Sequence, residues 1–206
     1  MYTKYGEKMN IGSNNSLTYL KPCNTWFKIF KQYGKCQDRD CETQYIFHGA
    51  RLFDFKLFVD KKNHIIIKNG NCQYPMFSFY ETLDFLNKKG DAVVLISLER
   101  QSEYMTENML KSIERKFIEI CQVIENIYED IGFCGGYRQS DKSKIYSFIW
   151  EEQHGLPIMV NPSEWSRLYR FVTMWCPSFI GKLNKKYIDK YENEHGFLLL
   201  NYVNKR

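Results

Sequence analysis

The 206-residue sequence contains no long hydrophobic run, which limits the classes of protein to which it can belong. Its longest uncharged apolar runs, AVVLISL at 92–98 and FLLLNYV at 197–203, are far shorter than the roughly 18 residues of a membrane-spanning helix. The segment YTKYGEKMN that follows Met1 lacks the apolar core of a signal peptide. We therefore expect a cytoplasmic protein, with a membrane-peripheral or an exported protein as the alternatives.

The sequence also lacks cysteine spacings that indicate a disulfide framework or a zinc site. It has seven cysteines, an odd number, and no pair has the two-residue gap of a zinc knuckle. Cys36 and Cys41 are candidates for a metal site or for pairing, but buried, unreactive thiols are the simpler interpretation. We expect no metal and no cofactor.

No strong excess of charge of one sign is present. The net charge of +5 comes from 29 basic and 24 acidic residues, and the basic residues are spread along the chain rather than clustered. Solvent-exposed faces explain them best, so we expect no nucleic-acid partner, and an anionic membrane surface is the alternative. A hydrophobic content of 44% and a charged content of 26% are typical of a soluble globular protein, and the length fits a single domain over 1–206.

Strand and helix patterns alternate along the chain. A short strand ends near Ile11, and further strands are predicted at 50–59, 64–68, 92–98, 145–150 and 196–203. Helices are predicted at 24–33, 41–48, 76–90, 106–128, 161–175 and 178–192, and the glycine-rich GFCGGYRQSDKSK at 132–144 is predicted to be a loop. This order predicts an α/β fold with a mainly parallel sheet, either a compact (β/α) barrel or an open doubly wound sheet.

In both folds the functional residues gather where the parallel strands end. The polar residues predicted in these positions are Asn14, Asn15, Asp54, Lys56, Lys68, Asn69, Glu99 and Asn201. Asp54 and Lys56 are two residues apart on one strand, so both side chains project from the same face, among apolar neighbours. They form either a buried structural ion pair or part of a site.

Several of these segments, in order, carry a family resemblance. GSNNSLTY resembles the GTHDSGTY loop of bacterial phosphatidylinositol-specific phospholipases C, and HGARLFDFKL resembles their GAR-FDIR strand. IIIKNG stands where that family has a strand ending in HHG, KCQDRDCETQ resembles its CQ and Q helix, and GFLLLNYVN resembles its closing GWVIQDYIN strand. The resemblance covers about 1–100 and 196–204, and it implies a single-domain, compact, distorted (β/α) TIM-type barrel and a metal-independent reaction.

The resemblance also implies roles for the strand-end residues. In that family one His takes the proton from the inositol 2-hydroxyl, a second His protonates the leaving glyceride oxygen, and an Arg with a nearby Asp stabilises the phosphate. The two His positions fall on Asn14 and Asn69, while the Asp is retained as Asp54 and the Arg falls on Lys56. The remaining positions, two acidic residues and an inositol-binding Lys, fall on Asn15, Asn201 and Glu99.

These replacements favour a catalytically degenerate relative that keeps a pocket for an inositol lipid headgroup or a phosphate ester, or serves as a scaffold. Lys56, Lys68 and Glu99 are the candidate ligand-binding residues. An amide has no usable pKa near neutrality, so neither Asn14 nor Asn69 can act as general base or acid. The alternatives are an active phosphoric diester hydrolase or lyase with a rearranged site, and an unrelated α/β domain.

The four histidines offer little to replace the missing groups. His64 lies on the opposite strand face from Asn69, and His48 and His195 lie at the wrong ends of their strands. His154 alone is predicted near a strand end, where a surface-loop residue is the simpler interpretation. Neither a phosphate loop nor a serine nucleophile elbow is present in the sequence.

Overall fold

The computed structural model describes residues 9–24, 36–60, 62, 64–98, 106–138, 145–147, 158–160, 177–194, 196–201 and 203–204. The strands are β1 (Met9–Ser13), β2 (Ala50–Val59), β3 (Ile65–Asn69), β4 (Cys72–Tyr74), β5 (Val93–Leu98), β6 (Gly132–Arg138), β7 (Ile145–Ser147), β8 (Ile158–Val160) and β9 (Gly196–Leu200). The helices are α1 (Cys41–Ile46), α2 (Met76–Lys89), α3 (Glu107–Ile127) and α6 (Pro177–Tyr191), with a 3-10 helix η2 (Ser16–Tyr19). The predicted helices at 24–33 and 161–175 lie almost wholly outside the described residues.

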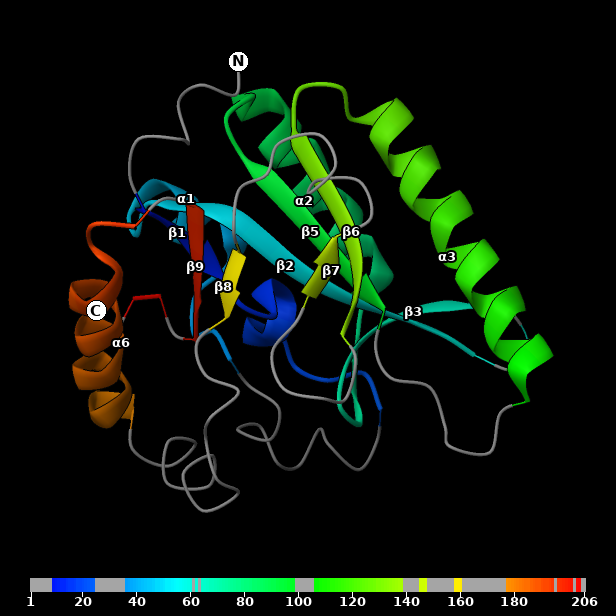
Figure 1. Ribbon diagram of the computed structural model, residues 1–206, viewed down its shortest axis with the longest axis horizontal. Coiled ribbons are helices and arrows are strands. Elements are labelled where there is room, and N and C mark those ends of the chain that lie inside the picture. Colours follow the sequence, from blue (N-terminus) through cyan, green and yellow to red (C-terminus); the bar gives the residue numbers. More distant parts are fainter. Residues whose placement is uncertain are drawn as a thin grey trace.

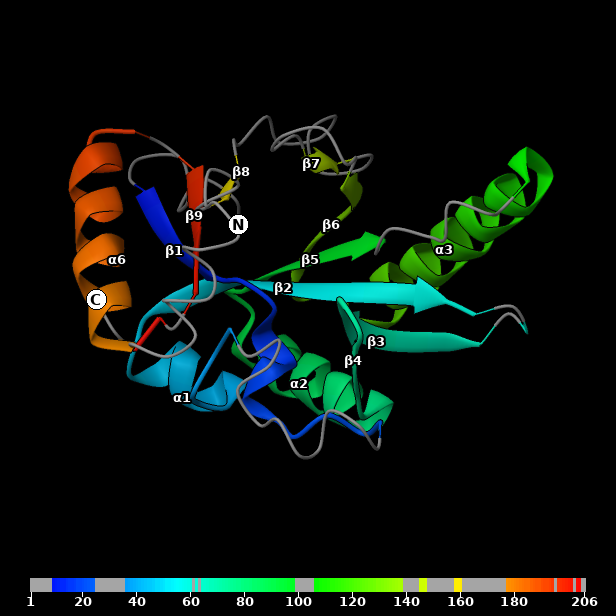
Figure 2. The same cartoon turned by 90° about the horizontal axis from the view of Figure 1, so that it is seen from below.

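The strands form one curved sheet in the order β7-β6-β5-β2-β1-β9-β8. All neighbours from β6 to β8 run parallel, whereas β7 pairs antiparallel with β6, and the β3–β4 hairpin extends the C-terminal half of β2. The described helices lie on the convex side of the sheet (Figures 1 and 2). The predicted α/β class with a mainly parallel sheet is therefore confirmed, and the one-sided helix layer does not match a doubly wound sheet.

The predicted closed barrel is confirmed only in part. Figures 1 and 2 both place β7 near β8, so the sheet curves most of the way round. Within the described part of the chain, however, no pairing joins these two edge strands. Each edge strand is three residues long and offers few backbone groups for pairing, and closure needs a continuous, consistent stagger of strands.

The alternating pattern of β2 determines which side chains face the helices. Phe53, Phe55 and Leu57 are buried in the main core, and the Phe55 ring meets Phe79 of α2 edge to face at a centroid distance of 5.0 Å. Leu52, Asp54 and Lys56 project from the opposite face, as the period of two predicts. The side chains of the second face therefore lie on the concave side of the sheet.

Local sequence signals set where α3 begins and where α2 ends, as predicted. The Thr106 hydroxyl accepts a hydrogen bond from the N–H of Met109 and caps α3. Gly90 ends α2 with φ 66°, the left-handed conformation that glycine adopts without steric cost. These elements agree with the prediction because capping depends only on near neighbours in the sequence.

The prediction of a loop at 132–144 is wrong over its first half. Gly132–Arg138 forms β6, which pairs in parallel with β5 and antiparallel with β7. Glycine is unfavourable in isolated strands, but pairing on both sides satisfies the backbone hydrogen-bonding groups. Tertiary pairing therefore overrides the local preference.

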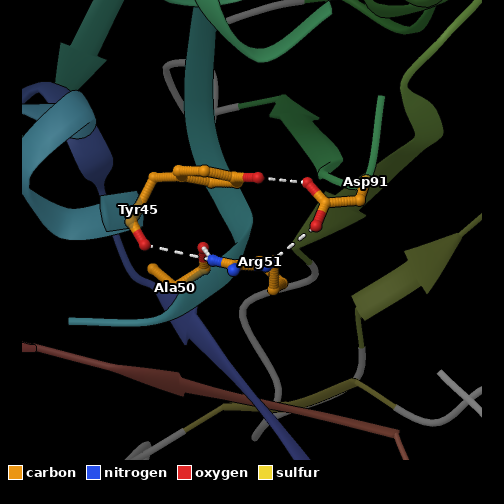
Figure 3. A network of polar contacts seen from close by, with 4 residues as sticks. All are labelled: Tyr45, Ala50, Arg51 and Asp91. Atoms are coloured by element: carbon orange, nitrogen blue, oxygen red, sulfur yellow. Dashed lines mark hydrogen bonds and ion pairs between the residues drawn. The ribbon is translucent and has the colours of Figure 1, made fainter. Parts of the chain in front are cut away.

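A polar cluster ties α1 to the start of β2 and to the turn before β5 (Figure 3). The Tyr45 hydroxyl donates to Asp91, and Arg51 pairs with the same carboxylate at an Nε–Oδ2 distance of 3.4 Å. The guanidinium also lies 4.1 Å from the centroid of the Tyr45 ring and donates to the Tyr45 carbonyl. Burial and the contact with Asp91 raise the pKa of the Tyr45 phenol.

We expect Tyr45→Phe to lower the free energy of unfolding by about 1 kcal/mol, the usual size of one partly exposed hydrogen bond. Because the folded-state pKa of Tyr45 is raised, the wild-type contribution is complete below pH 10 and is lost as the pH rises through the folded-state value. Urea unfolding at pH 7 measures the difference. Tyr80→Phe, at a tyrosine that is 42% exposed, is the matched control and should have little effect; equal losses in both variants would contradict the prediction.

Candidate functional site

The loop after β1 folds tightly back on itself at the C-terminal end of the sheet. Asn15 adopts the left-handed conformation, with φ 50° and ψ 60°, which Asn tolerates better than most residues. Its carbonyl accepts hydrogen bonds from the N–H and the hydroxyl of Thr18, at 3.0 and 2.8 Å. The Ser16 hydroxyl donates to the carbonyl of Ser13. These bonds hold the side chains of Asn14 and Asn15 in defined positions, and both residues are buried.

Close packing of β1 against its neighbours fixes where this loop begins. A Cβ atom at Gly12 would lie 2.7 Å from Cδ2 of Leu199 and 3.1 Å from Cβ of Leu52. The glycine therefore lets β1 sit between β2 and β9 without displacing either side chain.

Asn14 and Asn201 meet across the ends of two adjacent strands. The Asn14 Nδ2 atom donates to Asn201 Oδ1 at 2.7 Å, and the Asn14 N–H donates to the carbonyl of Leu200 at 3.0 Å. Asn184 of α6 donates to the Asn201 carbonyl at 2.8 Å. Two residues that are 187 positions apart in the sequence thus form one amide pair.

Asp54 and Lys56 are both buried on the concave face of β2, with exposures of 0% and 8%. The Asp54 carboxylate accepts hydrogen bonds from the N–H of Asn15, at 3.1 Å, and from the hydroxyl of Ser97, at 3.3 Å. The acidic side chain therefore anchors the loop after β1 to the middle of the sheet. Lys56 brings a positive charge to the same region.

The sequence did not identify Cys36 as part of this site. Its Sγ atom lies 3.4 Å from Nδ2 of Asn15 and 3.6 Å from Nδ2 of Asn69, so both amides donate to the sulfur. Burial raises the pKa of the Cys36 thiol, although Lys56 and the two amides act in the opposite direction. The thiol is consequently neutral at physiological pH, and the motif KCQ is the signal that could have identified it.

Gln37 holds Cys36 in place. It is completely buried, and its Nε2 atom donates to the carbonyls of Asn14 and Leu200 at 3.0 and 2.9 Å. Its Oε1 atom accepts from the N–H of Val203 at 3.1 Å. The neighbouring N–H of Cys36 donates to the hydroxyl of Thr18 at 2.8 Å. The segment at 36–37 is thus tied to β1, to β9 and to the loop after β1.

Polar and charged side chains from the loop after β1, from β2 and from the end of β3 line one small pocket, which we call the strand-end pocket. Its lining comprises Asn15, Leu17, Thr18, Asp54, Phe55, Lys56, Ile67, Lys68, Asn69 and Tyr74. The space open to the centre of a water molecule is about 10 Å³, room for about one water. In this conformation the pocket is too small for a phosphate group.

The structure brings most of the predicted site residues together. Asn15, Asp54, Lys56, Lys68 and Asn69 line the strand-end pocket, and the Lys68 ammonium lies 4.1 Å from the centroid of the Phe58 ring. Asn14 and Asn201 adjoin it through the loop after β1. Glu99 lies outside the described residues, so its predicted ligand contact stays a prediction.

The described histidines do not line the pocket. His64 is exposed and pairs with Asp60 at 3.2 Å, and His48 lies in the turn before β2. His154 and His195 lie outside the described residues. No group of three or more potential metal ligands occurs within the described part of the chain, where neither Cys36 nor Cys41 forms a disulfide. None of the helices described there is long and apolar enough to cross a membrane.

Comparison with known proteins identifies a similar fold. No family model matches the sequence, and no curated protein sequence matches it. Two solved structures of the S. aureus phosphatidylinositol-specific phospholipase C, from work on modulation of its membrane binding, are similar to this chain with a TM-score of 0.56. They are 13% and 14% identical to it, and the match covers 96% and 98% of this chain and 86% and 89% of the phospholipase chains. At these identities the likeness establishes that the chain has a phosphatidylinositol phospholipase C-like fold.

Proposed function

We propose that this protein is a catalytically degenerate relative of the phosphatidylinositol-specific phospholipases C. The observation that carries the proposal is the Asn14–Asn201 amide pair, at 2.7 Å. By resemblance, these positions hold the general-base His and the carboxylate that orients it. The contact between the two positions persists, but neither partner can now accept or release a proton near neutrality.

The second acid–base position also lacks a titrating side chain. Asn69, where the general-acid His falls by resemblance, donates its amide to the sulfur of Cys36. A positioned acid or base contributes roughly 10²–10⁴ to a rate. The two side chains that move protons in that family's reaction are therefore absent from these positions, while Asp54, Lys56 and Lys68 keep their charges at the pocket.

The retained charges support binding as the remaining role. Asp54 and Lys56 are buried together on β2, and Lys68 lines the same pocket. Lysine ammonium groups bind phosphate as point charges, so two lysines at one pocket favour an anionic ligand. This proposal covers three kinds of partner: a phosphate ester, an inositol lipid headgroup at a membrane surface, or a protein that uses the fold as a scaffold.

One observation favours a second candidate, an active phosphoric diester hydrolase or lyase with a rearranged site. Asp54 is retained, and a cation stands at the position of the phosphate-binding Arg, so charge stabilisation of a phosphorane-like transition state is still available. In this candidate Lys56 or Asp54 would take over the movement of protons. The candidate differs from the first in one measurable respect, which is turnover.

We expect the wild-type protein to release no cyclic inositol phosphate from phosphatidylinositol vesicles above background, with or without calcium. The Asn14→His/Asn69→His variant regains both titrating groups, and we expect it to show detectable release. Chromatography of the water-soluble products measures both. The matched control is Asn108→His/Asn193→His, which adds two histidines at exposed positions and should remain inactive. Robust turnover by the wild-type protein would overturn degeneracy in favour of the second candidate.

A further inference from the structure

Two cysteines from distant parts of the chain lie at the turn of the β3–β4 hairpin. The Cys36 sulfur is 3.6 Å from Nδ2 of Asn69, the last residue of β3. Asn69 pairs directly with Cys72, the first residue of β4, across the turn of the hairpin. Directly opposed residues of an antiparallel pair project from the same face, with Cβ atoms about 4.5–5.5 Å apart. The side chains of Cys36 and Cys72 are therefore both neighbours of the Asn69 side chain.

The electrostatics of the two thiols agree with this placement. Burial raises the pKa of the Cys72 thiol, and a negative charge on Cys36 raises it further, although a hydrogen bond with Tyr74 acts in the opposite direction. A charge shifts the pKa of another group in this way only at short range. Both cysteines are reduced in the structure.

The two thiols differ in how an oxidant reaches them. Cys36 is partly exposed, whereas Cys72 is 0% exposed in the main core. Burial raises the pKa of the Cys36 thiol, but the ammonium of Lys56 and the amides of Asn15 and Asn69 stabilise its thiolate, which is the reactive form. An accessible thiol with a second thiol next to it is the usual arrangement of a redox-responsive cysteine pair.

We propose that Cys36 and Cys72 are a redox-active pair that forms a disulfide when the protein meets a hydroperoxide. The Cys36 sulfur attacks the O–O bond and becomes a sulfenic acid, while the other peroxide oxygen takes the thiol proton and departs as water or an alcohol. The Cys72 sulfur then attacks the Cys36 sulfur, and the sulfenic oxygen leaves as water with the Cys72 proton. The two sulfurs together lose two electrons, and the peroxide gains both.

The disulfide would join two parts of the chain that border the strand-end pocket. The segment at 36–37 is tied to the ends of β1 and β9 through the side chain of Gln37. Cys72 lies between Asn69 and Tyr74, which both line the pocket. Oxidation would therefore fix the β3–β4 hairpin against the ends of β1 and β9. This inference goes beyond the proposed function, because it requires neither ligand binding nor turnover.

Peptide mapping of the full-length wild-type protein tests the pair directly. After dilute hydrogen peroxide, alkylation of the remaining thiols and digestion without reductant, we expect mass spectrometry to find Cys36 and Cys72 in one disulfide-linked peptide pair. Dithiothreitol should reverse the link. A bond from Cys36 to any other cysteine would contradict the pairing, and so would oxidation of Cys36 to sulfinic and sulfonic acids without a bond.

Single substitutions test which thiol reacts first. Cys72→Ser removes the second thiol, so dimedone, which reacts with sulfenic acids, should label Cys36 in this variant and not in the wild-type protein. Cys36→Ser should leave Cys72 unlabelled, because Cys72 is buried. The matched control is Cys121→Ser, which removes another buried cysteine and should form the bond as the wild-type protein does. Equal labelling of Cys72 in Cys36→Ser would refute the assigned order.

Thermal unfolding measures the effect of the bond on the fold. A disulfide between these positions restricts the unfolded chain, so the oxidised wild-type protein should have a Tm roughly 5–10 °C above that of the reduced protein. Cys121→Ser should show the same rise, and Cys36→Ser should show none. An unchanged Tm in protein that carries the bond would show that the bond does not fix the hairpin. These results do not involve phosphatidylinositol turnover, so failure of the inference and failure of catalytic degeneracy are distinguishable.

Discussion

A Gln37→Leu substitution is expected to lower the free energy of unfolding by about 3–5 kcal/mol. Leucine fills nearly the same volume but leaves the carbonyl of Asn14 and the N–H of Val203 without their buried partner, and the carbonyl of Leu200 with one partner fewer. Each buried group left unsatisfied costs about 1–3 kcal/mol. For a chain of this size the loss corresponds to a fall of roughly 10 °C in Tm.

Urea unfolding followed by circular dichroism measures this loss. Gln122→Leu is the matched control, because Gln122 is exposed on α3 and should tolerate the same change within about 0.5 kcal/mol. If Gln37→Leu unfolded at the wild-type urea concentration, the segment at 36–37 would not anchor the ends of β1 and β9.

An Asp54→Ala substitution is expected to cost about 3 kcal/mol of stability and to loosen the loop after β1. It removes the acceptor of the Asn15 N–H and of the Ser97 hydroxyl, both in the buried part of the sheet. It also removes a carboxylate from the strand face that carries the buried Lys56, and loss of an opposite charge near a buried cation is destabilising. Differential scanning calorimetry should show a lower Tm, and amide hydrogen exchange should be faster at Asn15.

The matched control for this substitution is Asp189→Ala on the exposed face of α6, which should change Tm by little. A double variant, Asp54→Ala/Lys56→Met, removes the charge together with its neighbouring carboxylate. It should recover part of the loss, because it removes the buried cation together with the carboxylate near it. If Asp54→Ala were as stable as the wild-type protein, the two charges would not depend on each other.

Most of the candidate site could be predicted from the sequence, but only as positions along strands. The period of two placed Asp54 and Lys56 on one face, and the order of the segments placed Asn14, Asn69 and Asn201 at strand ends. The structure brings these positions together in space. The sequence could not show which groups touch, because the Asn14–Asn201 contact joins residues 187 positions apart and depends on the pairing of β1 with β9.

Cys36 and Gln37 show where prediction stopped. A cysteine outside any disulfide or zinc spacing is usually a buried, unreactive thiol, and a glutamine is usually exposed. In the structure the segment at 36–37 lies against the ends of β1 and β9. There Gln37 donates to main-chain carbonyls, and the Cys36 sulfur accepts from two side-chain amides. No pattern of neighbouring residues in the sequence predicts those contacts.

By itself, the sequence determined the elements whose signals are local, such as the alternation of β2, the Thr106 cap of α3 and the glycine that ends α2. It also determined that Asn14 and Asn69 carry no group that titrates near neutrality, because a side chain's chemistry does not depend on the fold. Only the tertiary structure decided that the glycine-rich segment at 132–138 is a strand, that the sheet stays open in the part of the chain described, and that Cys36 contacts Asn15 and Asn69. These outcomes depend on the backbone pairing and packing of distant segments, and such contacts leave no periodic trace in a sequence.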